Sequence, residues 1–302
     1  MDTKGGTDGD ADVERPVVPR GRHLWLEDRG RTFVRELTGP AGAPTVVLLH
    51  GWTATADLNW WASYIPLAQH FNVVAIDHRG HGRGIRSADP FRLEQCADDV
   101  AALAAALGLE QIIPVGYSMG GPVAQLVWRR HRHLVAGLVL CATSASFQGT
   151  PRERMLAGLA TGTSALAGAV PLGRLTSAAL GKWTGWRSRR EAAWWGFEEV
   201  GRHDWTQILE AGRETLRFDS RSWIGGIDVP TAVVVTDDDG VVPTARQWAL
   251  AAQVPGASVW PVHGSHAVCT TSPERFVPSL VAACRRVGEA GAPVPARLAV
   301  AA

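Results

Sequence analysis

The chain has 302 residues, of which 46% are apolar and 20% are charged, an ordinary globular balance that allows a sizeable buried core. The length fits one large α/β domain with an insertion, or two ordinary domains. The formal net charge is +1, so the composition argues against nucleic acid or another polyanion as a partner.

Both ends of the chain are expected to lie outside the folded domain. Residues 1–22 are polar and Gly-rich and lack the basic start and apolar stretch of a signal peptide, so we expect a disordered leader. Residues 289–302 are expected to form a flexible tail. Residues 155–173 carry no charge, but they are mostly Ala, Gly, Ser and Thr and are too weakly apolar for a membrane span. We therefore expect no integral membrane contact.

Cysteine usage indicates the redox compartment. The four cysteines lie far apart and form no CxxC pair, which favours a reduced, cytoplasmic chain over a disulfide framework.

The predicted elements begin with residues 23–28 and 32–38, whose alternating pattern indicates an antiparallel hairpin. Short runs that are apolar on both faces come next, and they predict strands inside a parallel sheet. Helical patterns lie between several of these runs, so we predict an α/β fold with a doubly wound, mostly parallel eight-stranded sheet. The predicted strands are residues 45–49, 72–76, 111–115, 134–140, 231–235 and 257–262, and the clearest helices are 93–107, 119–130 and 273–286.

The alternation of strands and helices stops between residues 146 and 227. This segment has no convincing strand but holds six of the thirteen tryptophans. We predict a helical cap at residues 146–227, inserted into a core formed by residues 23–145 and 228–288. The six tryptophans are Trp183, Trp186, Trp194, Trp195, Trp205 and Trp223.

The strongest local motif is GYSMGG at residues 116–121, between a predicted strand and a predicted helix. A serine hydroxyl is a poor nucleophile unless it is held exposed beside a base. A sharp strand-to-helix turn holds the serine in a strained conformation and needs very small neighbours, which explains Gly116 and Gly120. The bare pattern is common in a Gly-rich chain, and its position between strand and helix makes it specific. We predict that Ser118 is a nucleophile.

A second motif, HGW at residues 50–52, comes directly after the predicted strand 45–49 and leaves the sheet at the edge where ligands bind in open α/β folds. Acyl transfer creates an oxyanion that needs preorganised donors. The backbone amides of Trp52 and Met119 are the predicted donors. We interpret His50 as a buried structural histidine, and the Trp52 side chain either belongs to the core or lines an acyl pocket.

Three carboxylates at residues 237–239 come after the predicted strand 231–235. A triad needs one of them to accept a hydrogen bond from the imidazole of the base. We predict Asp239 as the acid, because it lies at the turn before Gly240 and a helix that starts at a proline. For the base, His266 on a loop beyond a glycine is favoured over His263, which we expect to pack in or near a strand. The resulting order, Ser–Asp–His, is the one expected for this fold.

These motifs resemble those of the α/β-hydrolase superfamily, in particular capped serine hydrolases similar to esterases and haloperoxidases. The resemblance covers most of residues 23–288 outside the insertion. It is carried by the segments HGW at 50–52, DHRGHG at 77–82, GYSMGG at 116–121, TDDDGVVP at 236–243 and GSHAVCTTSPERF at 264–276.

The resemblance implies the same triad, because the family's acid typically lies four residues before a proline and its histidine seven residues before a Pro-Glu pair. Those spacings select Asp239 with Pro243, and His266 with Pro273. The family's cap comes after the sixth strand, where the tryptophan-rich segment lies. A serine at residue 118 argues against relatives that use an aspartate nucleophile, namely epoxide hydrolases and haloalkane dehalogenases.

We therefore expect a serine hydrolase that cleaves a carboxylic ester or related acyl bond through an acyl-enzyme, on a small hydrophobic substrate. A perhydrolase, a lactonase and a carbon–carbon bond hydrolase share the same triad and remain alternatives, as does a non-catalytic ligand-binding receptor. No cofactor is expected, because the GHGRGI segment lacks the last glycine of a dinucleotide fingerprint. No metal is expected either, since His131 and His133 have no acidic or thiol ligand near them in sequence.

Overall fold

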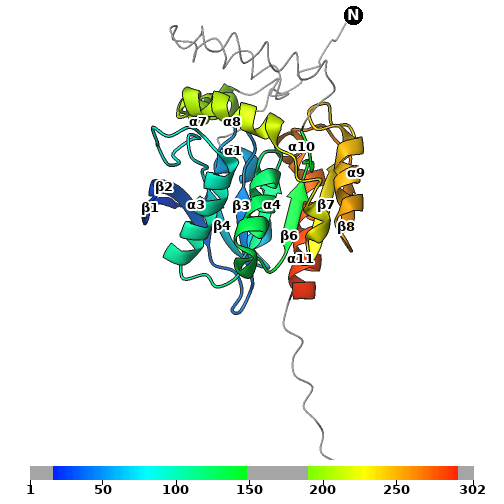
Figure 1. The fold of residues 1–302 in the computed structure, drawn as a ribbon. Coiled ribbons are helices and arrows are strands. Elements are labelled where there is room, and N and C mark those ends of the chain that lie inside the picture. Colours follow the sequence, from blue (N-terminus) through cyan, green and yellow to red (C-terminus); the bar gives the residue numbers. More distant parts are fainter. Residues whose placement is uncertain (1–15, 148–189, 292–302) are drawn as a thin grey trace, which may run out of the picture.

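The computed structural model describes residues 16–147 and 190–291 (Figure 1). An eight-stranded sheet runs through it in the order β1-β2-β4-β3-β5-β6-β7-β8. All neighbouring strands from β4 to β8 pair in parallel, whereas β1 and β2 form an antiparallel hairpin that continues antiparallel onto β4. The strands are β1 (Gly21–Leu26), β2 (Gly30–Leu37), β3 (Thr45–Leu49), β4 (Asn72–Ile76), β5 (Ile113–Tyr117), β6 (Leu138–Cys141), β7 (Thr231–Thr236) and β8 (Ser258–Val262).

Helices cover both faces of this sheet and one end of it. Figure 1 shows α3 and α4 in front of the sheet, and α7 and α8 across the end from which the loops after β3 and β4 emerge. The helices are α1 (Ala56–Trp60), α2 (Tyr64–Ala68), α3 (Leu93–Ala106), α4 (Gly120–Arg130), α7 (Arg190–Gly201), α8 (Trp205–Arg217), α9 (Thr244–Gln253), α10 (Val268–Thr271) and α11 (Pro273–Gly291), with short 3-10 turns η1 (Arg132–Leu134) and η2 (Ile224–Gly226).

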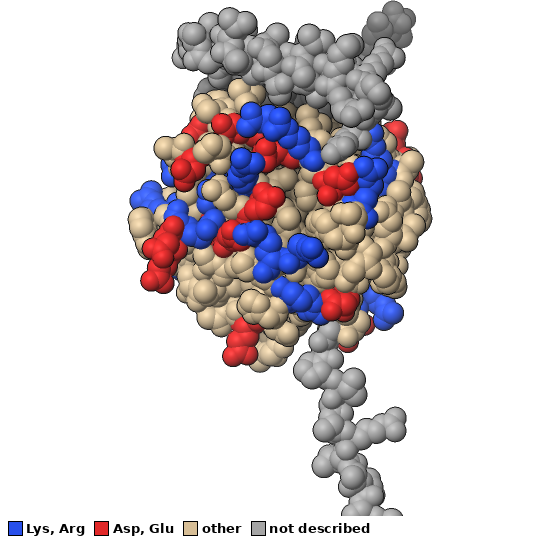
Figure 2. Space-filling model, in the orientation of Figure 1, with Lys and Arg blue, Asp and Glu red and all other residues tan. Residues whose placement is uncertain are grey.

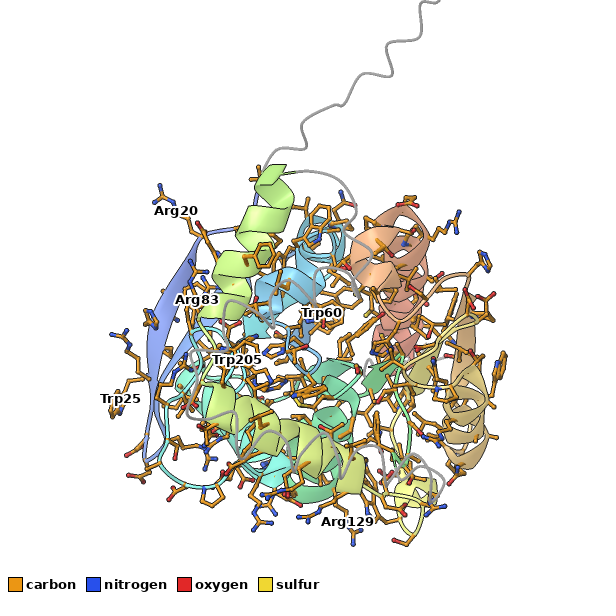
Figure 3. All side chains as sticks on the ribbon, turned by 90° about the horizontal axis from the view of Figure 1, so that it is seen from above. Arg20, Trp25, Trp60, Arg83, Arg129 and Trp205 are labelled. Carbon is orange, nitrogen blue, oxygen red and sulfur yellow. The ribbon has the colours of Figure 1, made fainter. Side chains whose placement is uncertain are left out.

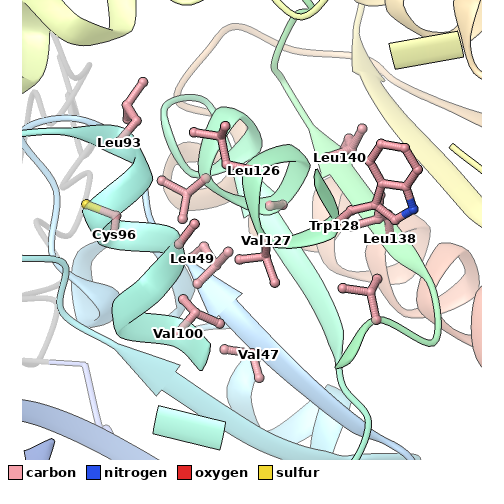
Figure 4. Packing of buried hydrophobic residues seen from close by; sticks show 14 of the residues in the cluster. Val47, Leu49, Leu93, Cys96, Val100, Leu126, Val127, Trp128, Leu138 and Leu140 are labelled. Atoms are coloured by element: carbon pink, nitrogen blue, oxygen red, sulfur yellow. The ribbon is translucent and has the colours of Figure 1, made fainter. Parts of the chain in front are cut away.

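Alternate residues of the central strands divide the core into two layers, because successive side chains of a strand point to opposite faces. Val47 and Leu49 of β3 belong to the layer that contains α3 and α4. Figure 4 shows these two side chains beside Val100 of α3 and Val127 of α4. The intervening β3 residues pack in the opposite layer with α1, α2 and α11. Burial on both faces is the reason that these strands are apolar throughout.

The strand order places two loops side by side. The chain passes from β3 to β4 on one side and then returns to β5 on the other, so β3 pairs with both. Such a reversal leaves a crevice at the carboxyl ends of the two strands, where ligands bind in open α/β sheets. The HGW segment comes after β3 and the GYSMGG turn ends β5, so both motifs lie at this crevice.

Several boundaries differ from the predicted ones. The first strand begins at Gly21, so the predicted leader of residues 1–22 is too long at its inner end. Helix α11 continues to Gly291 and therefore includes the start of the predicted tail of residues 289–302. Strand β6 begins only at Leu138, because within the predicted run 134–140 Leu134 ends a 3-10 turn and Val135 forms an isolated bridge to Ile112.

The predicted cap falls partly outside the described residues. Within the described part of residues 146–227 the regular elements are α7, α8 and η2. The uncharged segment 155–173 and two of the tryptophans, Trp183 and Trp186, lie outside the described residues. Trp195 is buried, and Trp223 stacks on Trp128 with ring centroids 6.2 Å apart. Among the described helices, none combines the length and apolar character needed to cross a membrane.

The four cysteine thiols are free and buried. Burial raises the pKa of each thiol, to about 12 for Cys269, because a thiolate loses its hydration in the core. On the face of the molecule that carries α3 and α4, basic and acidic side chains are intermingled (Figure 2).

Candidate active site

Ser118 lies at the sharp turn between β5 and α4. Its φ of +53° is a left-handed conformation that L residues rarely adopt, and the turn therefore holds it under strain. A side chain at Gly116 would collide with the backbone of Gly120, and one at Gly120 would collide with the backbone of Leu49. The two glycines thus allow the close backbone approach that this turn requires, as the motif predicts.

Ser118, His266 and Asp239 form a continuous chain of hydrogen bonds. Ser118 Oγ and His266 Nε2 are 2.9 Å apart, and His266 Nδ1 lies 2.7 Å from Asp239 Oδ2. The three residues come from the loops after β5, β8 and β7, so the parallel sheet brings together residues separated by up to 148 positions. With its Nδ1–H donated to a carboxylate, the imidazole keeps Nε2 available to accept the serine proton.

The carboxylate of Asp239 is buried and fully occupied by donors. Oδ1 accepts from the backbone amides of Val241 and Val242 at 2.9 Å each, and Oδ2 accepts from Thr236 Oγ1 at 2.7 Å and Gln247 Nε2 at 3.0 Å in addition to His266. Burial alone raises the pKa of Asp239, but the hydrogen bonds from His266, Thr236 and Val242 outweigh burial and lower it. The acid is therefore held as a carboxylate.

The histidine loop is also anchored. Tyr117, the residue before the serine, donates its hydroxyl to the backbone carbonyl of His266 at 2.7 Å. The same turn that exposes Ser118 thus fixes the backbone of the histidine. Neither Tyr117 nor Gln247 could be assigned these roles from local sequence, because both contacts join separate elements of the chain.

The HGW loop lies against the serine. A side-chain carbon added at Gly51 would be 3.2 Å from Ser118 Cβ, which shows how closely the two loops approach. The amide of Gly51 donates to Asn59 Oδ1 at 2.9 Å, and its carbonyl accepts from His50 Nδ1 at 2.8 Å. The amides of Trp52 and Met119 are not hydrogen-bonded to any of the described residues, so both remain available as donors.

His50 is a buried structural histidine, as predicted. It is fully buried, and its Nε2 accepts from the backbone amide of His78 at 2.9 Å while Nδ1 donates to Gly51. Burial lowers its pKa, so the ring stays neutral and can serve as donor and acceptor at once.

The prediction that His263 packs in or near the strand is wrong. Its side chain is 73% exposed and pairs with Asp237 at 3.0 Å. Strand β8 ends at Val262, one residue earlier, so the ring leaves the sheet at its edge and faces solvent. His266 is the histidine that reaches the serine.

A polar network beneath α7 was not predicted. Arg83 lies beside α7 in Figure 3, and its guanidinium contacts three carboxylates, Asp57 at 2.7 Å, Glu199 at 3.3 Å and Asp77 at 3.4 Å. Glu199 belongs to α7, whereas Asp57 and Asp77 belong to the core. The network therefore ties α7 to the loops after β3 and β4.

Comparison with known proteins identifies the family to which the fold belongs. Residues 44–273 match the alpha/beta hydrolase fold family, and the chain belongs to that family. It is 34% identical over 216 residues to the pimeloyl-(acyl-carrier protein) methyl ester esterase of Sodalis glossinidius, an alignment that covers 68% of this chain and 79% of that protein.

Two further likenesses extend the comparison. A bifunctional esterase/perhydrolase of Acinetobacter calcoaceticus is 38% identical over 125 residues, which cover 38% of this chain and 45% of that protein. The enol-lactonase of Burkholderia xenovorans LB400 superposes with a TM-score of 0.75 at 23% identity, covering 87% of this chain and 100% of that one. The structural likeness shows the shared fold, and the relatives are hydrolases.

Proposed function

We propose that the protein is a serine hydrolase that cleaves a carboxylic ester or related acyl bond through an acyl-enzyme. The observation that carries the proposal is the unbroken chain from Ser118 Oγ through His266 to the carboxylate of Asp239, with contacts of 2.9 and 2.7 Å. A hydroxyl becomes an effective nucleophile when a base of this kind is positioned to take its proton.

In the proposed mechanism Ser118 Oγ attacks the substrate carbonyl while His266 Nε2 accepts its proton. Asp239 stabilises the imidazolium that forms. The developing oxyanion binds the amides of Trp52 and Met119, and collapse of the intermediate releases the alcohol with the proton from His266. Water, activated by His266, then attacks the acyl-serine, releases the acid and restores the serine hydroxyl.

The substrate is proposed to be a small hydrophobic ester. In support, the loops that carry the amide donor and the acid expose apolar side chains, Trp52 at 45% and Val241 at 42%. An acyl-chain series tests this part separately, since a higher kcat/KM for short, charged acyl groups than for apolar ones would contradict it.

A fluorophosphonate probe tests the mechanism. We expect it to label the wild-type chain and not Ser118→Ala, because an activated serine displaces fluoride from the probe and becomes phosphonylated, whereas an unactivated serine does not react. Hydrolysis of p-nitrophenyl butyrate should be lost in parallel. Absence of labelling in the wild-type chain would contradict the proposal and favour a ligand-binding role for the same fold.

A perhydrolase, a lactonase and a carbon–carbon bond hydrolase would use the same three side chains. The likeness to an esterase/perhydrolase supports assaying ester hydrolysis and peracid formation side by side. Lactones and vinylogous diketones complete the panel, and the substrate with the highest kcat/KM identifies the reaction.

A further inference from the structure

The segment after β3, residues 51–55, is joined to α7, to α8 and to the turn between them by three side-chain hydrogen bonds. We call this segment the oxyanion loop, because it carries the proposed amide donor of Trp52. The three bonds all reach residues more than 140 positions away in the chain. They are Trp52 Nε1 to the Ile208 carbonyl at 2.7 Å, His203 Nε2 to the Thr53 carbonyl at 3.1 Å, and Thr55 Oγ1 to Glu199 Oε2 at 3.0 Å.

The indole of Trp52 lies on one turn of α8, between Ile208 and Gly212. A side-chain carbon at Gly212 would be 2.7 Å from Cζ2 of the indole. Glycine within a helix lowers helix stability by about 1 kcal/mol relative to alanine, so a glycine at this position needs a structural explanation. The reason is the space that it leaves for the ring.

The core fixes only one side of the Gly51–Trp52 peptide. The Gly51 carbonyl accepts from His50 Nδ1 at 2.8 Å and from the Ala54 amide at 3.3 Å. Because a trans peptide is planar, its carbonyl and the adjoining N–H point in opposite directions, and these bonds aim the Trp52 amide away from them. The peptide moves only with the loop that carries it, and that loop continues through Thr53.

The backbone of Thr53 is strained. Its φ of +59° is a left-handed conformation for a β-branched residue. Such a residue persists only where its surroundings hold it. The hydrogen bonds on either side of Thr53 do not come from the sheet: Trp52 bonds to α8, and the Thr53 carbonyl bonds to His203 in the turn between α7 and α8.

We propose that α8 holds the oxyanion loop in its productive position through the indole of Trp52, which makes Trp52 a positioning residue through its side chain as well as an oxyanion donor through its amide. The inference rests on the proposed serine-hydrolase function. Since the oxyanion is absent from the bound substrate and develops on the way to the tetrahedral intermediate, the contact stabilises the transition state rather than the bound substrate. Helix α8 thereby contributes to catalysis.

The test uses two variants that break the same contact in different ways. Trp52→Phe keeps an aromatic ring but removes the N–H donor, and Gly212→Ala keeps the donor but pushes the ring away. Misplacing a catalytic group by about 1 Å can reduce a rate about 100-fold, and we expect each variant to lower kcat about 10-fold with little change in KM. Trp248→Phe is the matched control, because Trp248 is 46% exposed on α9, and it should keep the wild-type kcat.

The double variant makes the test sharper. A phenylalanine ring does not reach the position of indole Cζ2, so Gly212→Ala should cause no further loss in the Trp52→Phe chain, although it does in the wild-type chain. Affinity for an alkyl trifluoromethyl ketone, whose enzyme adduct carries an oxyanion, should fall by the same factor as kcat/KM. If the contact had a purely structural role, the variants would lose thermal stability, but inhibitor affinity and kcat/KM would not fall by the same factor.

Each outcome decides the question. Single variants with wild-type kcat, losses confined to KM, or additive losses in the double variant would overturn the role of the contact. If the wild-type chain itself shows no Ser118-dependent labelling by fluorophosphonate, the proposed function fails first. Wild-type labelling together with wild-type kcat in both variants would leave the function standing and refute only this inference.

Discussion

Gln247 of α9 donates its side-chain amide to Asp239 Oδ2 at 3.0 Å, and it also donates to Thr236 Oγ1 at 2.7 Å. Its own Oε1 accepts from the Thr236 amide at 3.0 Å. A single fully buried amide therefore ties the helix, the end of β7 and the proposed acid together.

Gln247→Glu should reduce activity through Asp239. A second buried carboxylate removes one donor and adds a like charge, which raises the pKa of Asp239 and weakens its hold on His266. We expect kcat for p-nitrophenyl butyrate to fall about 10- to 100-fold at pH 7.5. Gln253→Glu, on the same helix, controls for the added charge, and equal rates for the two variants would contradict the role of Gln247.

Asp239→Asn should lower kcat about 10,000-fold while the chain stays folded, because an amide holds the imidazole in the wrong tautomer. Steady-state kinetics and circular dichroism measure the two effects. Asp238→Asn, at the exposed neighbouring carboxylate, should keep nearly full activity. A large loss in Asp238→Asn together with a small loss in Asp239→Asn would show that the acid was assigned to the wrong residue.

Gly121→Ala should destabilise the fold, because the added methyl group would collide with the side chain of Thr143. Overpacking of this kind costs about 1–3 kcal/mol. Urea unfolding measures the difference. Gly201→Ala is the matched control, since a methyl group there meets nothing within 4 Å and should change stability by less than about 1 kcal/mol.

The stability of the protein should fall as the pH drops from about 6.5 to 4, and His203 accounts for part of the loss. Burial lowers the pKa of His203 to about 4. In the unfolded chain the ring takes a proton near pH 6.5, whereas in the folded chain it stays neutral until about pH 4, so acid favours the unfolded state across this window.

Removing this histidine should flatten the pH profile. Above pH 6.5 His203 causes no loss of stability, and by pH 4 it has lowered the free energy of unfolding by about 3 kcal/mol. In urea unfolding at pH 7.5, 6 and 4.5, His203→Gln should lose less stability with acid than the wild-type chain, with His133→Gln at an exposed histidine as control. Parallel profiles for wild type and His203→Gln would refute the assignment.

The sheet was predictable because its central strands are buried on both faces and are therefore apolar throughout. The convergence of Ser118, Asp239 and His266 was predictable for a related reason, since each of them follows a strand whose carboxyl end lies at one edge of the sheet. The start of β6 at Leu138 was not predictable, because it depends on the pairing of that strand with β5 and β7 rather than on local composition.

The contacts that support the site escaped prediction for a common physical reason. Gln247, Tyr117 and His203 act through hydrogen bonds to residues of other elements, and a single sequence carries no signal of such pairs. The wrong expectation for His263 has a similar origin, because only the position at which β8 ends decides whether the ring faces core or solvent.

Because all four thiols are buried, cysteine alkylation and serine-directed labelling report different properties of this molecule. Alkylating reagents need an accessible thiolate, which the native chain withholds by burying each sulfur and raising its pKa. The rate of cysteine alkylation therefore reports how often the core opens, and serine-directed reagents report the state of the folded surface. The same sample can thus reveal conformational opening and chemical competence as independent signals.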